Sequence, residues 1–429
     1  MKIAFHTLGC KVNQYETQAM RKLMEAAGWE TAEFSVGKVD ADVLVVNSCT
    51  VTGESDRKLR QLLRRCRREN PTAVLVLTGC MPQAYPAAAA DLVQADIVLG
   101  NAARRDLPVC VAEYLTHRER IVRIPPHEKA IEPLDIDAFQ GRTRAYVKIQ
   151  DGCNRFCSYC IIPYARGRVR SRQPDDIRKE LTRLAAAGYK EIVLVGINLT
   201  AYGQDNGLSI ADAVEAACQV EGIERVRLGS LEPDFMTDEV LARLAACDKL
   251  CPQFHVALQS GCDDTLRRMN RHYDTALFAD LCYRLRQLFP ACAITTDVMV
   301  GFPGESEEEF RRSMEFVKKI DFSQAHVFSY SRRPGTVADR MTGQVPAAVK
   351  AARSRQLIAV CEESARRYAA AYIGKQVNVL LETPHEDGTV TGHTDTYLTV
   401  RVNTSCGSGE LIPVTITAFA GNELIGEEA

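Results

Sequence analysis

Short runs of aliphatic residues alternate with amphipathic helical stretches along most of this chain, and this alternation restricts the fold more than any other feature. Near the N-terminus the runs lie at residues 3–5, 42–46 and 73–77, and a helical stretch follows each of them. Strands that alternate with helices form parallel sheets with crossover helices. The pattern therefore predicts an N-terminal open parallel α/β domain over residues 1–123.

Each of these three predicted strands ends in a small polar loop that carries a cysteine. The cysteines are Cys10, Cys49 and Cys80. Ligands of open α/β sheets bind beyond the carboxyl ends of the strands, so three cysteines at equivalent strand ends should converge in space. The alternative is packing as small hydrophobic groups, although packing would favour positions inside the strands. Cys66 and Cys110 have no such placement, and for them packing is the preferred interpretation.

A second and longer alternation follows residues 124–143, a stretch without periodicity that we interpret as a linker. Six βα units whose functional loops follow the strands fit a partial (β/α)6 TIM-like barrel over residues 144–370. Six units are two short of closure, so this barrel should be open on one side, which suits a large substrate. The candidate strands are 145–149, 191–195, 225–228, 255–258, 294–300 and 325–329.

The composition changes again after residue 370. Residues 371–429 are rich in valine, threonine and glycine and contain alternating runs, which is typical of a small all-β barrel. This segment holds two basic and eight acidic side chains, a net charge of −6, whereas the remaining 51 basic and 47 acidic side chains give +4. The overall charge of −2 excludes a uniformly basic nucleic-acid binder, but it leaves room for local basic segments.

Two such basic segments are present. Residues 142–172 contain eight basic side chains opposed only by Asp151, and a predicted helix at 57–68 carries arginines and a lysine around one apolar face. The helix is either a solvated surface or a surface that contacts phosphates. The chain has no apolar run long enough to span a membrane and no signal peptide, so we expect a cytoplasmic protein with reduced cysteines.

The strongest motif in the sequence is a C-x3-C-x2-C loop directly after the first strand of the second alternation. Its cysteines are Cys153, Cys157 and Cys160. Three thiols at this spacing fit within one loop and can ligate three irons of a [4Fe–4S] cluster. A zinc ion would need a fourth nearby ligand, which this segment does not supply. An iron without a protein ligand can coordinate a small molecule.

This loop resembles the cluster loop of the radical SAM superfamily, and the chain as a whole is similar to the methylthiotransferase family within it. The order of three domains carries the resemblance, together with recurring blocks at 161–167, 259–261 and 297–305. Residues 8–16 resemble the branch that modifies N6-threonylcarbamoyladenosine beside the tRNA anticodon. The resemblance also implies that the C-terminal β-barrel is TRAM-like and holds tRNA, despite its acidity.

The resemblance implies two [4Fe–4S] clusters, one on the strand-end cysteines and one on the C-x3-C-x2-C loop, with S-adenosylmethionine as the second cofactor. The implied reaction places a methylthio group on C2 of N6-threonylcarbamoyladenosine at position 37 of tRNA. One S-adenosylmethionine methylates a sulfur, and another is cleaved after one-electron reduction to give a radical. The implied partners are the tRNA anticodon stem-loop and an electron donor such as flavodoxin or ferredoxin.

Further site residues follow from barrel geometry, because the ends of the strands should face the cofactor. For the polar ones, loop capping is the alternative; Tyr159 instead matches the family's aromatic position beside adenine. Four arginines at alternate positions would contact RNA phosphate or the threonylcarbamoyl carboxylate, or else line a solvated edge. The predicted cofactor-binding residues are Tyr159, Gly196, Asn198, Ser230, Glu232, Gln259, Ser260, Gly301 and Pro303, and the arginines are Arg166, Arg168, Arg170 and Arg172.

Two alternative functions stay open at this point. A methylthiotransferase of the same family would act on isopentenyladenosine in tRNA or on an aspartate of a ribosomal protein, and the acidic C-terminal domain suits a basic protein partner. A non-catalytic iron–sulfur sensor or RNA-binding module would explain the cysteines and arginines, but it leaves the open iron and the barrel without a role.

Overall fold

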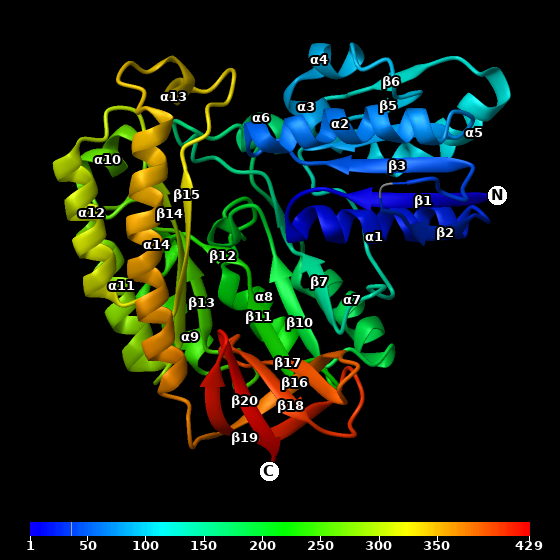
Figure 1. Ribbon diagram of the computed structural model, residues 1–429. Coiled ribbons are helices and arrows are strands. Elements are labelled where there is room, and N and C mark those ends of the chain that lie inside the picture. The colour runs from blue at the N-terminus through cyan, green and yellow to red at the C-terminus, as the bar shows by residue number, and fades with distance from the viewer. Residues whose placement is uncertain (36) are drawn as a thin grey trace. The chain divides into compact units, whose positions relative to one another are not determined.

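The computed structural model describes residues 1–35 and 37–429, which divide into two compact units (Figure 1). The first unit comprises residues 1–140, 150–172 and 331–339, and the second comprises 141–149, 173–330 and 340–429. This division differs from the predicted domain bounds, because two segments distant from the N-terminus in sequence make their contacts mainly with helices and loops of residues 1–140. One of these segments contains the C-x3-C-x2-C loop.

The first unit is built on a six-stranded parallel sheet in the order β2-β1-β3-β4-β5-β6. The predicted strands at 3–5, 42–46 and 73–77 are confirmed as β1, β3 and β4, and the last two are buried along their whole length. Uninterrupted aliphatic runs are expected for parallel strands that are covered on both faces. The strands are β1 (Lys2–Thr7), β2 (Glu30–Glu33), β3 (Val43–Ser48), β4 (Val74–Gly79), β5 (Ile97–Leu99) and β6 (Ile121–Arg123).

Helices cover both faces of this sheet and create two apolar cores. On one face α2 buries Leu59 and Cys66, and on the other α1 and α5 bury Met20 and Cys110. The packing role predicted for Cys66 and Cys110 is therefore confirmed. At the start of α2 the Ser55 N–H donates to the Thr52 hydroxyl at 3.2 Å, an N-cap that fixes where the helix begins. The helices are α1 (Lys11–Ala26), α2 (Gly53–Glu69), α3 (Cys80–Ala84), α4 (Pro86–Ala90), η1 (Asn101–Asp106) and α5 (Leu107–His117).

Short elements from the two distant segments complete the first unit. Strand β8 (Gln150–Asp151) pairs antiparallel with β9 (Arg170–Ser171), and helix α6 (Ile162–Arg166) lies between them in sequence. The segment 331–339 leads into α13 (Val337–Arg340). These elements frame the C-x3-C-x2-C loop.

The second unit contains the six predicted barrel strands, which are confirmed as β7, β10, β11, β13, β14 and β15. They form the sheets β11-β10-β7 and β12-β13-β14-β15, in which all described pairs are parallel. The outer strands are β7 and β15, so among the described residues the barrel is open between them, as predicted. The strands are β7 (Arg144–Lys148), β10 (Glu191–Val195), β11 (Arg225–Leu228), β12 (Ser230–Leu231), β13 (Gln253–Val256), β14 (Ala293–Val300) and β15 (Gln324–Ser329).

Helices follow the strands of this barrel as expected for βα units. Helix α12 begins with a capping box in which the side chains of Ser306 and Glu309 each accept a backbone N–H of the other residue. The helices are α7 (Pro174–Ala186), η2 (Leu199–Ala201), α8 (Ile210–Cys218), η3 (Pro233–Phe235), α9 (Asp238–Ala245), α10 (Asp263–Arg268), α11 (Thr275–Leu288), α12 (Glu307–Ile320) and α14 (Ala347–Ala370). None of the helices in the described ranges is long and apolar enough to cross a membrane.

The C-terminal part of the second unit is a closed barrel in the order β16-β17-β18-β20-β19. Its interior is filled by inward-facing aliphatic side chains such as Val379, Val400 and Val414. The predicted small all-β barrel is therefore confirmed. Its strands are β16 (Gln376–Pro384), β17 (Thr389–Thr394), β18 (Thr399–Asn403), β19 (Leu411–Ala420) and β20 (Glu423–Glu428).

Candidate functional site

Cys10, Cys49 and Cys80 lie at the carboxyl ends of the neighbouring strands β1, β3 and β4. A Cβ atom at Gly9, whose φ is +109°, would lie only 2.6 Å from Cys49 Cβ, so the first two loops touch and glycine is required there. The Asn13 Oδ1 atom lies 3.9 Å from the Sγ atoms of both Cys10 and Cys80. The Asn13 amide thus lies beside Cys10 and Cys80, and Cys49 lies against the loop that carries Cys10.

The ionisation of these thiols depends on their surroundings. Cys49 and Cys80 are buried and Cys10 is exposed, so the trio reaches the surface at Cys10. Burial raises the pKa of the Cys49 thiol to about 11, and the nearby Cys80 and Cys10 add to this effect. Metal ligation requires the thiolate form. Binding a positively charged metal centre would therefore displace these protons and compensate the buried negative charge.

The donor set of this trio fits an iron–sulfur cluster better than zinc. A structural zinc ion takes four cysteine or histidine ligands, whereas the described polar side chains that contact the sulfurs are the amides of Asn13 and Asn101. Three cysteines are the protein ligands of a cluster that keeps one iron open.

A different set of side chains has the close spacing that a single metal ion needs. The potential ligand atoms of Cys262, Asp264 and Glu309 all lie within 4.8 Å of one another. Arg268 donates to both carboxylate oxygens of Glu309, and Arg312 donates to Asp264 and to the Cys262 sulfur. These guanidinium groups already neutralise the carboxylates, so the trio is an ion-pair cluster.

The C-x3-C-x2-C loop lies between β8 and α6 in the first unit, and its three cysteines are half-buried. The Arg155 N–H donates to Cys153 Sγ at 3.5 Å, and the Cys160 N–H donates to the Cys157 carbonyl at 2.9 Å. Phe156 has a φ of +49°, a left-handed conformation that is uncommon for a bulky residue and that reverses the chain within the loop. A left-handed residue thus lies between the first two cysteines of the loop, and a backbone hydrogen bond links the last two.

Neighbouring segments hold this loop in place. The Cys153 N–H donates to the Gly167 carbonyl at 3.0 Å, and the Ser158 carbonyl accepts from the Ala338 N–H at 2.7 Å. Gly152 has a φ of +75°, and a Cβ atom there would lie 1.9 Å from the Arg168 carbonyl oxygen, so only glycine fits.

The arginines that follow the loop correct part of the sequence-based prediction. Arg166, Arg170 and Arg172 are buried, and Arg166 pairs with Glu16 at 2.7 Å. Buried arginines held by groups of the protein do not offer their charge to RNA, so the predicted RNA contact is wrong for these three. The extended segment that would align the four side chains is interrupted by α6 and by a turn at residue 167. Arg168 is exposed, and its RNA contact stays a prediction.

Several predicted cofactor-binding residues lie at the strand ends of the second unit. The Thr200 hydroxyl donates to Asn198 Oδ1 and accepts the Glu232 N–H, both at 3.0 Å, so it joins the ends of β10 and β12. Glu232 also forms a 2.6 Å ion pair with Arg271. Ser230 is exposed in β12, and Gly196 is half-buried after β10.

The remaining predicted residues of this group follow β13 and β14. The Gln259 N–H donates to the Asp297 carbonyl at 2.8 Å, so the chain beyond β13 continues to pair with β14. Ser260 and Pro303 are buried, and the Gly301 N–H donates to the Glu305 carboxylate at 2.7 Å. Contact of these residues with a cofactor stays a prediction, as does that of Tyr159, which lies in the cysteine loop of the first unit.

The residues that sequence reasoning missed surround the strand-end cysteines. Asn13 and Glu16 lie on α1, three and six positions after Cys10, so their proximity to that cysteine was a usable signal. Asn101 and Arg104 in η1 come from a part of the sequence that offers no such signal.

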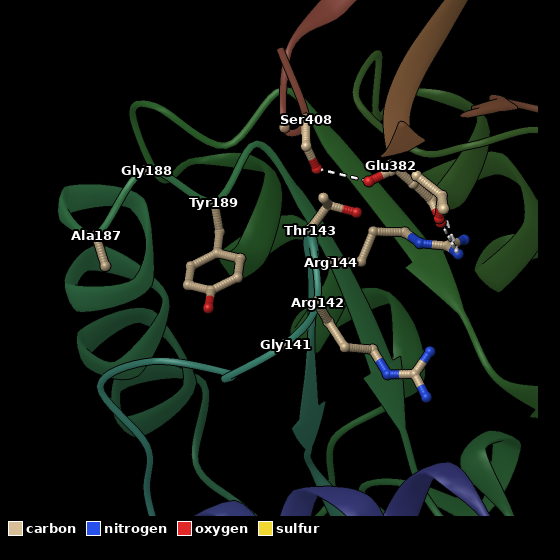
Figure 2. A pocket seen from close by; sticks show the side chains of 11 residues that line it. Gly141, Arg142, Thr143, Arg144, Ala187, Gly188, Tyr189, Glu382 and Ser408 are labelled. Atoms are coloured by element: carbon tan, nitrogen blue, oxygen red, sulfur yellow. Dashed lines mark hydrogen bonds and ion pairs between the residues drawn. The ribbon is translucent and has the colours of Figure 1, made fainter. Parts of the chain in front are cut away.

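A cavity of about 480 Å³ lies at the amino-terminal end of β7 (Figure 2). Arg142, Tyr189 and Glu382 contribute to its lining, and Ser408 Oγ donates to the Glu382 carbonyl at 2.7 Å. Catalytic loops of βα barrels lie at the carboxyl ends of the strands. The cavity is therefore at the end of the barrel opposite the predicted cofactor-binding residues.

Comparison with known proteins relates this geometry to a family. Residues 147–317 match the radical SAM superfamily, and residues 2–100 match the uncharacterized protein family UPF0004. Among solved structures, the radical S-adenosylmethionine methyltransferase TsrM from Kitasatospora setae has a TM-score of 0.59 at 15% identity, covering 79% of this chain and 77% of that chain. This likeness concerns the fold alone.

Curated relatives are much more similar in sequence. The threonylcarbamoyladenosine tRNA methylthiotransferase MtaB of Bacillus subtilis is 43% identical over 406 residues, which is 93% of this chain and 89% of the relative. A tRNA-2-methylthio-N(6)-dimethylallyladenosine synthase of Clostridium botulinum is 34% identical over 434 residues, 98% of this chain and 96% of the relative. The superfamily match gives the chain S-adenosylmethionine and a [4Fe–4S] cluster as cofactors. By these similarities the chain belongs to the radical SAM methylthiotransferase family.

Proposed function

We propose that this protein methylthiolates C2 of N6-threonylcarbamoyladenosine at position 37 of tRNA, next to the anticodon, to give 2-methylthio-N6-threonylcarbamoyladenosine. The observation that carries the proposal is the presence of two cysteine trios, one at strand ends and one in a C-x3-C-x2-C loop, in one compact unit. The 43% identity to a threonylcarbamoyladenosine tRNA methylthiotransferase favours this substrate over the dimethylallyl form, for which the relative is 34% identical.

The two cysteine trios would hold two [4Fe–4S] clusters. Cys153, Cys157 and Cys160 would hold the cluster that binds S-adenosylmethionine, and the strand-end trio would hold the second. When bound, these groups supply the one-electron and sulfur chemistry that an unactivated aromatic C–H bond requires. The protein fixes the loops: Gly152 lets the first loop pass close to the Arg168 backbone, and Asn13 ties together the loops of the second trio.

The strand-end residues of the barrel would bind and orient S-adenosylmethionine. Asn198 and Glu232 are suited to this because the Thr200 hydroxyl fixes one to the other. Gln259 and Ser260 follow β13, where backbone pairing with β14 restrains them. Tyr159 would pack against the adenine ring, since an aromatic ring stacks on any base.

The RNA would approach with its modified base turned out of the anticodon loop, because a stacked base is not accessible to an active site. The exposed side chain of Arg168 is available to contact the RNA phosphates. Arg60 and Arg64, which lie on one exposed face of α2, are available as well. An electron donor of the flavodoxin or ferredoxin class would supply electrons, and we expect the reaction in the cytoplasm, where tRNA is matured.

Nucleoside mass spectrometry of tRNA from a host that lacks the gene tests this function. Restoring the wild-type gene should produce the 2-methylthio form of threonylcarbamoyladenosine, whereas Cys10→Ala and Cys153→Ala should not. Cys406→Ala, which changes a half-buried cysteine of the C-terminal barrel, is the matched control and should restore the product. Appearance of 2-methylthio-isopentenyladenosine alone would contradict the substrate, and unchanged tRNA nucleosides would contradict the RNA assignment.

A further inference from the structure

A buried polar layer lies beneath the strand-end cysteines, and its centre is the fully buried Arg166. Its Nη1 and Nη2 atoms donate to the two carboxylate oxygens of Glu16 at 2.7 and 3.0 Å, and Nη1 also donates to Asp151 Oδ1 at 3.2 Å. Arg104 pairs with the same Glu16 carboxylate. Bidentate pairing of this kind holds a guanidinium group in one orientation and stabilises its positive charge.

One amide separates this guanidinium from two of the sulfurs. Arg166 Nη2 donates to Asn13 Oδ1 at 2.6 Å, and that oxygen is the atom 3.9 Å from the sulfurs of Cys10 and Cys80. The Asn13 amide cannot turn freely, because its Nδ2 donates to the carbonyls of Leu8 and Ser48 at 2.8 and 3.0 Å. The positive charge of Arg166 is therefore held directly behind the cysteine trio.

A second buried group approaches the trio from η1. Asn101 Nδ2 lies 3.7 Å from Cys80 Sγ, where it can donate to the sulfur, and it also donates to the Ala165 carbonyl at 2.9 Å. Ala165 is adjacent to Arg166 in α6, so both contacts link the trio to the helix that follows the C-x3-C-x2-C loop.

The charge of Arg166 is permanent. Burial alone would lower its pKa, but the charges of Cys80, Glu16 and Asp151 hold the pKa well above its usual range. The reduction potential of an iron–sulfur cluster depends on its net charge, on hydrogen bonds to its sulfurs and on exposure. A fixed cation and an N–H donor both stabilise the more negatively charged, reduced form.

We propose that Asn101 and Arg166 are positioning residues of the Cys10, Cys49 and Cys80 site that raise the reduction potential of the cluster held there. The inference rests on the proposed function, which places a [4Fe–4S] cluster at this trio. Asn101 acts through its hydrogen bond to the Cys80 sulfur, and Arg166 acts through its charge behind Asn13.

The potential of this cluster alone can be measured in the full-length protein with Cys153, Cys157 and Cys160 all changed to alanine. The protein is reconstituted with iron and sulfide and titrated with dithionite and mediators while the EPR signal is recorded. In this background Asn101→Leu and Arg166→Met should each shift the midpoint to a lower potential, and Arg166→Lys, which keeps the charge, should shift it less than Arg166→Met.

Asn70→Leu is the matched control, because Asn70 is a buried asparagine of the same unit that bonds to the backbone at residues 37, 39 and 66. Its midpoint should equal that of the parent. If the parent and Asn101→Leu have equal iron content and equal midpoint potentials, the inference is overturned. This outcome can be read even if Arg166→Met binds no iron. A parent protein that binds no iron would instead overturn the proposed second cluster.

Discussion

Replacing Glu191 by glutamine should strongly destabilise the second unit. Glu191 begins β10, is completely buried and faces three arginines of adjacent strands. Its carboxylate lies 2.9 Å from Arg227, 3.5 Å from Arg225 and 3.8 Å from Arg144. Glutamine has nearly the same shape but removes the one charge that these three guanidinium groups share, so it isolates the electrostatic contribution.

The same arginines fasten the C-terminal barrel to the βα barrel. Arg225 donates to the Asn378 carbonyl at 2.7 Å, and Arg227 donates to the Asp395 carbonyl at 2.8 Å. Removing one partner of a buried ion pair leaves uncompensated charge and costs about 3–5 kcal/mol. In a unit of this size that cost corresponds to a decrease in melting temperature of roughly 10 °C.

Thermal unfolding followed by far-UV circular dichroism measures this loss. Trp29 is the single tryptophan and lies in the first unit, so its fluorescence provides a separate signal for that unit. Glu224→Gln is the control, because the exposed pair of Glu224 with Lys190 should contribute only about 0–1 kcal/mol. If Glu191→Gln and Glu224→Gln melt at the same temperature, the buried carboxylate does not organise the arginines as argued.

The difference in stability between wild type and Glu191→Gln should depend on pH. Burial alone would raise the pKa of Glu191, but Arg227, Arg144 and Arg225 outweigh it and hold the pKa below its usual value. A carboxylate with a lowered folded-state pKa stabilises the protein above its ordinary pKa, and this contribution is lost as the pH falls through the folded-state value. The stability difference between wild type and Glu191→Gln should therefore be constant near neutral pH and disappear in acid.

Two further substitutions test the cysteine loop and the RNA surface. Gly152→Ala should prevent the loop from closing against Arg168 and lower the iron content of the purified protein, whereas a variant with full iron content would show that the loop has room to shift. Arg60→Glu with Arg64→Glu on exposed α2 should weaken tRNA binding and reduce the slope of log affinity against log salt by roughly 1.5. The same reversal at Lys318 and Lys319 on α12 is the control, and an equal loss there would show a non-specific charge effect.

Much of the fold could be predicted because the central strands are covered on both faces. Such strands need uninterrupted aliphatic runs, which are visible in sequence for β3, β4 and β10. Strands β2 and β20 escaped prediction because one reads Glu-Thr-Ala-Glu and the other is rich in glutamate. These strands lie beside others that supply the apolar surface, so their own composition carries little signal.

The cysteines could be located for a similar reason, while the surroundings of Arg166 could not. The pattern of a strand followed by a cysteine occurs three times in the sequence. Because the carboxyl ends of parallel strands lie at the same edge of the sheet, this pattern predicts a common site. The partner Glu16 is separated from Arg166 by 150 residues, and nothing in the local pattern around either residue indicates the pair. Two of the four arginines that the sequence pattern assigns to RNA, Arg166 and Arg170, instead pair with buried carboxylates.

The two cysteine trios lie in the same compact unit, so contacts within that unit set the distance between them. In sequence the C-x3-C-x2-C loop lies between β7 and α7 of the second unit, but its side chains and backbone bond within the first. Arg166 after the loop pairs with Glu16 on α1, and the Ser158 carbonyl within it accepts from Ala338. Under the proposed function a group passes between the two cysteine sites, and a misplacement of about 1 Å is enough to slow such a step. Buried ion pairs and backbone hydrogen bonds of the first unit connect the segments that carry the two trios, so the separation of the trios does not depend on how the two units are placed.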